Sequence, residues 1–87
     1  PRPGVMKAEC TLSDIHWISD AAPSAEFRCE VRPRYRSNGA IATVKITGEG
    51  EGSVVFDEPQ FALTPGQAAV FYNEAEVLGG GWIDMLP

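Results

Sequence analysis

Apolar and polar residues alternate along most of the chain, and Gly or Pro interrupts the alternation every few residues. Alternation with a period of two is typical of strands that bury one face, and no segment shows the period of an amphipathic helix. Several short strands separated by turns predict an all-β barrel or sandwich, and a small closed antiparallel barrel would leave no exposed sheet edge. We expect strands at about 6–12, 27–32, 42–47, 53–56, 68–72, 76–78 and 82–85.

Glycine and proline mark the turns between these strands. Asn38-Gly39 is a strong hairpin signal, because both residues tolerate positive φ. Pro65 followed by Gly66 suits the centre of a type II turn over residues 64–67. The three glycines at 79–81 lack the ending of a phosphate-binding loop, so we expect a bulge or a barrel corner there.

A two-residue turn at Asn38-Gly39 would fix the register of its hairpin. Val31 would then lie opposite Ile46, and Arg32 would lie opposite Lys45. This register separates an apolar face from a basic face, and Pro33 indicates an edge or a bulge. The basic face would collect Arg32, Arg34, Arg36, Thr43 and Lys45.

Length and composition indicate one small folded domain over residues 1–87. The chain has a mass of 9.4 kDa, 44% hydrophobic residues and 22% charged residues. No apolar run reaches the roughly 20 residues of a membrane-spanning helix. The net charge of −5 counts against a surface that binds nucleic acid all over, although a local basic patch remains compatible with it. The chain begins with Pro1, which suggests a piece of a longer protein.

The sequence offers no catalytic or metal centre of its own. Cys10 and Cys29 match no metal-binding spacing, and we interpret both as reduced thiols in the core. His16 has no partner at zinc spacing, so a packed or half-exposed position is favoured over a ligand role. No Ser/His/Asp set or close pair of carboxylates stands out.

The basic cluster is the one local feature that departs from the overall acidity. Side chains two residues apart on a strand point the same way at about 6.6 Å spacing. A row of Arg28, Arg32, Arg34 and Arg36 could therefore follow a phosphate backbone, to which Arg binds well. A solvated strand face, partly neutralised by Glu30, explains the same row equally well.

Four segments together resemble the C-terminal barrel of the tRNA-specific 2-thiouridylases. They are RYR at 34–36, FDEPQ at 56–60, TPGQAAVFY at 64–72 and LGGGWI at 78–83. The resemblance covers nearly the whole chain, and residues 14–18 fit the family's first strands. It implies a barrel similar to the second domain of translation elongation factors, which forms a C-terminal part of a larger enzyme.

The resemblance also implies a function for the parent enzyme. Such an enzyme uses ATP to activate the wobble uridine of certain tRNAs, and it then replaces the C2 oxygen with sulfur in the cytoplasm. Its nucleotide-binding loop and catalytic cysteines lie in N-terminal domains, so Cys10 and Cys29 inherit no catalytic role, and this domain needs no cofactor. Its partners would be the tRNA anticodon region, sulfur-donor proteins and those missing domains.

The family pattern places Arg34, Tyr35 and Gln67 against the tRNA. Arg32, Arg36 and Lys45 would add phosphate contacts on the same basic face. Regular alternation puts Tyr35 on the apolar face, so either a bulge at Pro33 turns its ring outward or only its hydroxyl is exposed. We therefore expect a tRNA-docking domain without a catalytic centre. The competing interpretation is a protein-binding barrel whose Arg-rich face meets an acidic partner.

Overall fold

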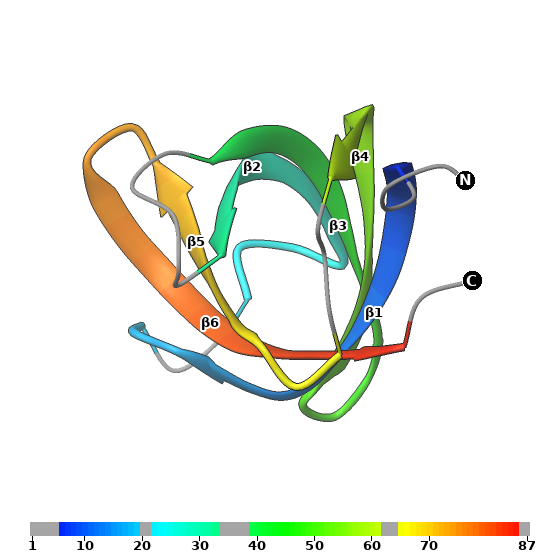
Figure 1. Ribbon diagram of the computed structural model, residues 1–87. Helices are drawn as coiled ribbons and strands as arrows, with labels where there is room; N and C mark the ends of the chain where they lie inside the picture. The colour runs from blue at the N-terminus through cyan, green and yellow to red at the C-terminus, as the bar shows by residue number, and fades with distance from the viewer. Residues whose placement is uncertain (1–5, 20–21, 34–38, 62–64, 86–87) are drawn as a thin grey trace.

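Six antiparallel strands close into one barrel in this computed structural model, which describes residues 6–19, 22–33, 39–61 and 65–85 (Figure 1). The strand order around the barrel is β1-β4-β3-β2-β5-β6. The strands are β1 (Met6–Trp17), β2 (Glu26–Pro33), β3 (Ala40–Gly48), β4 (Glu51–Phe61), β5 (Ala68–Asn73) and β6 (Glu76–Met85). The predicted all-β class and the closed antiparallel barrel are confirmed. No described segment is a helix that could span a membrane.

Strand β1 closes the barrel because it pairs with two neighbours in succession. Its first half, from Met6 to Leu12, pairs with β4, and its second half, from Thr11 to Trp17, pairs with β6. Figure 1 shows the blue strand bending from the green β4 toward the orange and red β6. Every strand therefore has two hydrogen-bonded neighbours, and the sheet has no free edge.

The core consists of the inward-facing residues of all six strands, as the alternation predicts. Cys10 and Leu12 face inward from β1, and Cys29 and Val31 face inward from β2. The larger part of the buried set is contributed by the other strands and the end of β1: Ile15, Ala42, Val44, Val54, Phe56, Ala69, Phe71 and Ile83. Trp17 and Phe27 pack on Phe71 at one end of this core, with ring centroids 5.4 and 6.5 Å away.

The glycine run lies inside β6, which continues through it as a single strand. The pairing with β5 shifts by one residue between Phe71 and Tyr72, so the run is accompanied by a bulge rather than a break. A Cβ atom at Gly79 would collide with the carbonyl oxygen of His16, and one at Gly80 would lie 2.7 Å from the carbonyl oxygen of Ala69. The neighbouring backbones thus leave no room for side chains at these positions.

Both cysteines are free thiols buried in the core, which confirms the sequence-based prediction. Burial raises the pKa of Cys10 to about 11. Burial, together with the charge of Glu30, raises the pKa of Cys29 to about 11 as well. The two side chains act here as small apolar groups rather than as nucleophiles.

Gly79→Ala should destabilise the barrel by about 1–3 kcal/mol, because an added methyl group overpacks the contact between β6 and β1. Urea unfolding would measure this as a lower midpoint. Gly48→Ala is the matched control, since its nearest neighbour is the flexible carboxylate end of Glu51 at 3.1 Å. Equal midpoints for the two variants would contradict the close approach of β1 and β6.

Ellman's reagent at pH 8 should leave Cys10 and Cys29 unmodified in the native protein and find two thiols after denaturation. A thiol that reacts at once in the native state would show that one of the inward positions is wrong.

The free energy of unfolding should fall as the pH rises above about 9. The thiols of the unfolded chain ionise there, while the buried thiols of the folded protein stay protonated to about pH 11.

Candidate nucleic-acid interface

The end of β2 and the start of β5 lie together at one end of the barrel. Pro33, the last residue of β2, pairs with Ala69 near the start of β5. Arg32 and the turn at 65–66 before Gln67 are therefore close to the same strand ends. Of the predicted site residues, Arg32 and Gln67 lie at this end, whereas Arg34, Tyr35 and Arg36 fall outside the described residues.

The turn that carries Gln67 is fixed to the end of β6. The backbone N–H of Ile83 donates to the carbonyl oxygen of Gln67 at 2.7 Å, and the N–H of Gly66 donates to the carbonyl oxygen of Ile83 at 2.7 Å. Gly66 has a φ of 91°, which the second central position of a type II turn requires. Gln67 itself is half-buried. The turn predicted from Pro65-Gly66 is therefore present, and it holds Gln67 in a defined place.

Arg32 is held on the outer face by two neighbours. Its guanidinium carbon lies 4.1 Å from the centroid of the Tyr72 ring, and its Nη2 donates to Oε2 of Glu30 at 3.2 Å. The Nε atom of Arg32 is buried and has no hydrogen-bond partner. Stacking and ion pairing leave the guanidinium oriented but only 30% exposed.

Glu30 joins the two ends of the connection between β2 and β3. Its Oε2 atom accepts hydrogen bonds from Arg32 and from the backbone N–H of Gly39 at 3.0 Å. Arg32 lies just before residues 34–38, and Gly39 lies just after them. One carboxylate thus holds Arg32 and Gly39 near each other. These two residues lie on either side, in the sequence, of the Arg-Tyr-Arg segment. The sequence suggested only that Glu30 neutralises charge, because this role depends on tertiary contacts.

The predicted hairpin register is wrong. Val31 lies opposite Ala40 rather than Ile46, a shift of six positions along β3. Residues 34–39 separate the end of β2 from the start of β3, so Asn38-Gly39 alone does not join the two strands. An even shift keeps the same residues on the same face, so the separation into an inner apolar face and an outer polar face still holds.

Lys45 consequently lies away from the other predicted tRNA contacts. It pairs with Glu26 in β2 and with Ser53 in β4, so its neighbour across β2 is an acidic residue rather than Arg32. Glu26 and Arg32 are six residues apart on β2, or about 20 Å along the strand. The like-charge pair expected between Arg32 and Lys45 does not exist, so these two side chains do not flank a common phosphate position.

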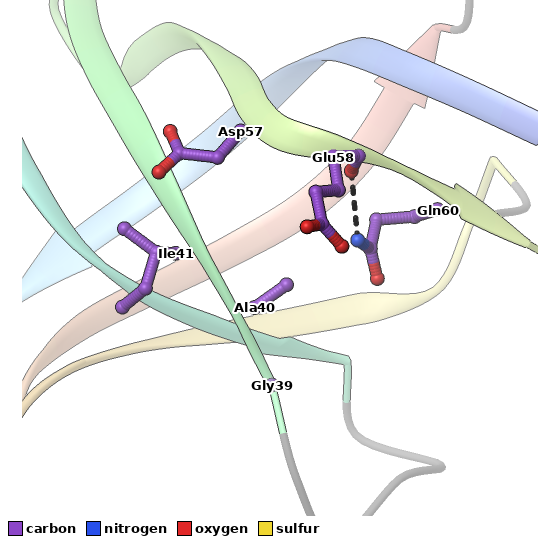
Figure 2. A pocket seen from close by; sticks show the side chains of 6 residues that line it. All are labelled: Gly39, Ala40, Ile41, Asp57, Glu58 and Gln60. Atoms are coloured by element: carbon purple, nitrogen blue, oxygen red, sulfur yellow. Dashed lines mark hydrogen bonds between the residues drawn. The ribbon is translucent and has the colours of Figure 1, made fainter.

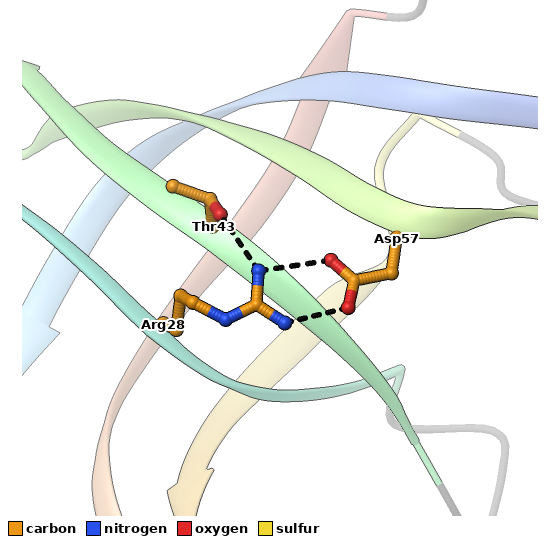
Figure 3. A network of polar contacts seen from close by, with 3 residues as sticks. All are labelled: Arg28, Thr43 and Asp57. Carbon is orange, nitrogen blue, oxygen red and sulfur yellow. Dashed lines mark hydrogen bonds and ion pairs between the residues drawn. The ribbon is translucent and has the colours of Figure 1, made fainter.

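Arg28, the first member of the predicted arginine row, forms an ion pair with Asp57 of β4 (Figure 3). Its Nη1 and Nη2 atoms donate to the two carboxylate oxygens at 3.0 and 2.6 Å, and Nη1 also contacts the Thr43 hydroxyl at 3.4 Å. The hydrogen bond and the charge of Arg28 lower the pKa of Asp57, and Asp57 raises the pKa of Arg28. Both described arginines of the row are therefore paired with carboxylates.

A hollow beside the same end of the barrel is acidic. It lies between the start of β3 and the end of β4, and Figure 2 shows Asp57, Glu58 and Gln60 facing Ala40 and Ile41 across it. The side chain of Gln60 donates to the carbonyl oxygen of Glu58 at 2.9 Å. Asp57 is already paired with Arg28, and the second carboxylate, that of Glu58, repels phosphate, so this hollow does not favour a nucleic-acid backbone.

The described residues contain no group of three or more His, Cys, Asp or Glu side chains that could hold a metal ion. His16 is largely exposed on β1, and its Nε2 lies 3.5 Å from Oδ1 of Asp14. It is thus more exposed than the sequence suggested. The outer face of the barrel presents polar side chains, one stacked arginine and isolated apolar residues such as Trp82.

These features define a small closed antiparallel β-barrel, and the comparisons with known proteins identify its family. Residues 7–83 match the model of the aminomethyltransferase β-barrel domain, and the chain belongs to this family. The chain is 47% identical over 83 residues to a tRNA-specific 2-thiouridylase MnmA of Nostoc punctiforme, a match that covers 95% of this chain and 24% of that protein.

Two further relatives carry the same name. A tRNA-specific 2-thiouridylase MnmA 2 of Geobacillus kaustophilus is 52% identical over 71 residues, covering 82% of this chain and 19% of the relative. The MnmA of Francisella philomiragia is 42% identical over 81 residues, covering 93% and 23%. The chain thus spans about a fifth to a quarter of the length of these relatives. The resemblance to the tRNA-specific 2-thiouridylases is confirmed.

Proposed function

We propose that this barrel is the C-terminal tRNA-docking domain of an ATP-dependent enzyme that places sulfur at C2 of the wobble uridine. The observation that carries the proposal is the similarity over 82–95% of the chain to proteins named as tRNA-specific 2-thiouridylases. ATP use, contacts with sulfur-donor proteins and the chemical step belong to the rest of such an enzyme. The task of this domain is to hold the tRNA, and a cytoplasmic location follows from that task.

The docking surface we propose centres on the barrel end at which β2 finishes and β5 begins. Arg32 and Gln67 lie there, and Arg34, Tyr35 and Arg36 follow directly after β2 in the sequence. Arginine contacts phosphates, tyrosine stacks on unpaired bases, and glutamine bonds a base edge or a 2′-hydroxyl group. Lys45 is left out of this surface because its pairing places it far along the sheet.

A general acidic-protein partner has less support. That alternative needs an exposed arginine row, but Asp57 and Glu30 already pair with Arg28 and Arg32. A second surface of positive charge is not visible among the described strands. The pairing of these arginines therefore favours binding of the partner at one end of the barrel over binding along the whole strand face.

Arg34→Ala should weaken tRNA binding by this chain and reduce the salt slope of log affinity by about 0.7–0.9, because one phosphate contact is lost. Gln67→Ala should weaken binding less and leave the slope unchanged, since a neutral side chain releases no counterion. Fluorescence anisotropy with a labelled tRNA transcript over a salt series would measure both effects, with duplex DNA as the weaker competitor.

Lys45→Gln is the matched control, because it removes one exposed positive charge at a distance from the proposed surface. It should leave both the affinity and the salt slope unchanged. If Lys45→Gln and Arg34→Ala weaken binding equally, attraction to tRNA is a property of overall charge, and the proposed docking end is wrong.

A further inference from the structure

A second hollow lies on the outer face of the barrel over β1, β5 and β6. Its lining includes the exposed side chains of Trp82, His16 and Asp14, and a floor of Ala68, Val70 and Gly80. Trp82 is 48% exposed, which is unusual for the largest apolar side chain. The sequence did not single out this group, because its members come from three separate strands.

The floor of the hollow is flat because β6 carries glycine where the side chain would point outward. Gly80 and Trp82 are two residues apart and therefore share the outer face of the strand. Val70 pairs with Gly80, and Ala68 pairs with Trp82. The indole thus lies beside a surface of backbone and short apolar side chains. Such a surface leaves room for a planar ring to stack against the face of the indole.

A bulge in β1 supplies the polar rim. The pairing of β1 with β6 shifts between Ser13 and His16, and Asp14 adopts a left-handed backbone conformation with φ of 55°. Asp14 and His16 both lie exposed on the outer face, while Ile15 between them is buried. The Asp14 carboxylate, 3.5 Å from the imidazole, presents acceptor oxygens at the edge of the hollow.

The hollow adjoins the proposed docking end. Ala68 directly follows Gln67, and the N–H of Ile83, next to Trp82, donates to the carbonyl oxygen of Gln67. On the other side, Val70 pairs with Arg32 across β2 and β5. A nucleic acid held at Gln67 and Arg32 would therefore lie within one strand spacing of the hollow.

We infer that this hollow binds an unpaired nucleobase of the bound RNA, stacked on Trp82 with its edge toward Asp14. This inference rests on the proposed function. Stacking suits every base, and the carboxylate accepts from the exocyclic amino group of adenine or cytosine, which uracil lacks. The same negative charge keeps phosphates out of the hollow, so the base rather than the backbone enters it.

Tryptophan fluorescence can test the inference because the chain has only two tryptophans. Trp17 is half-buried and packed against Phe27 and Phe71, with centroids at 5.7 and 5.4 Å, whereas Trp82 is the more exposed of the two indoles. An unmodified tRNA transcript should quench the emission of Trp82. Trp82→Leu should abolish the quenching and weaken tRNA binding about tenfold, and Trp82→Phe should retain most of the affinity.

Val55→Ala is the matched control, since it shortens another exposed apolar side chain, on β4, and should leave tRNA binding unchanged. A second arm uses single-stranded oligonucleotides of A, C or U. The oligonucleotide concentration that gives half-maximal quenching of Trp82 should be several-fold lower for the A and C oligonucleotides than for the U oligonucleotide. Asp14→Asn, which tolerates the left-handed conformation, should reduce that preference by removing the charge.

The outcomes separate this inference from the proposed function. If wild-type protein binds tRNA by anisotropy but Trp82 emission is unchanged and Trp82→Leu binds equally well, the nucleobase site is wrong and the docking role stands. If wild-type protein does not bind tRNA, the proposed function fails, and the oligonucleotide arm still decides whether the hollow accepts a base.

Discussion

Closure of the barrel depends on the close approach of β6 to β1 and β5 at the glycine run 79–81. Side chains at Gly79 and Gly80 would meet the backbone of β1 and β5, so the strands can pair at this distance only without them. This contact gives β1 its second neighbour and removes the last free edges of the sheet. The same lack of side chains leaves the outer surface beside Trp82 flat. One constraint on folding therefore also shapes a surface on which a ring can stack.

Charge on the outer face is organised locally rather than as a basic stripe. Asp57 holds Arg28, and Glu30 with Tyr72 holds Arg32, although the chain as a whole is acidic. Such pairing orients each guanidinium but reduces its attraction for distant phosphates. Binding of a polyanion would then depend on the barrel end where Glu30 joins Arg32 to Gly39. This arrangement favours a specific docking geometry over general adhesion to nucleic acid.

The alternation of residues predicted the strands and their faces well, since a period of two is a local property that burial enforces. Cys10, Cys29, Val44 and Phe56 are buried on that account. The predicted register of β2 with β3 is wrong because every even shift satisfies the same alternation, and a two-residue turn at Asn38-Gly39 selects a different one of those shifts. The hollow beside Trp82 could not be predicted, because β1, β5 and β6 each supply part of it. The contacts of Glu30 with Arg32 and Gly39 are local in the sequence, but they depend on a register that alternation does not select.

Mapping tRNA onto the barrel by backbone amide NMR shifts tests the central claim most directly. A tRNA titration should shift the amides of Arg32, Gln67 and Ala68 and the indole N–H of Trp82. The amides of Glu26 and Lys45, which pair with each other about 20 Å from Arg32 along β2, should stay unchanged. Shifts concentrated around Lys45 and Glu26 would contradict a docking surface at the end where β2 finishes and β5 begins.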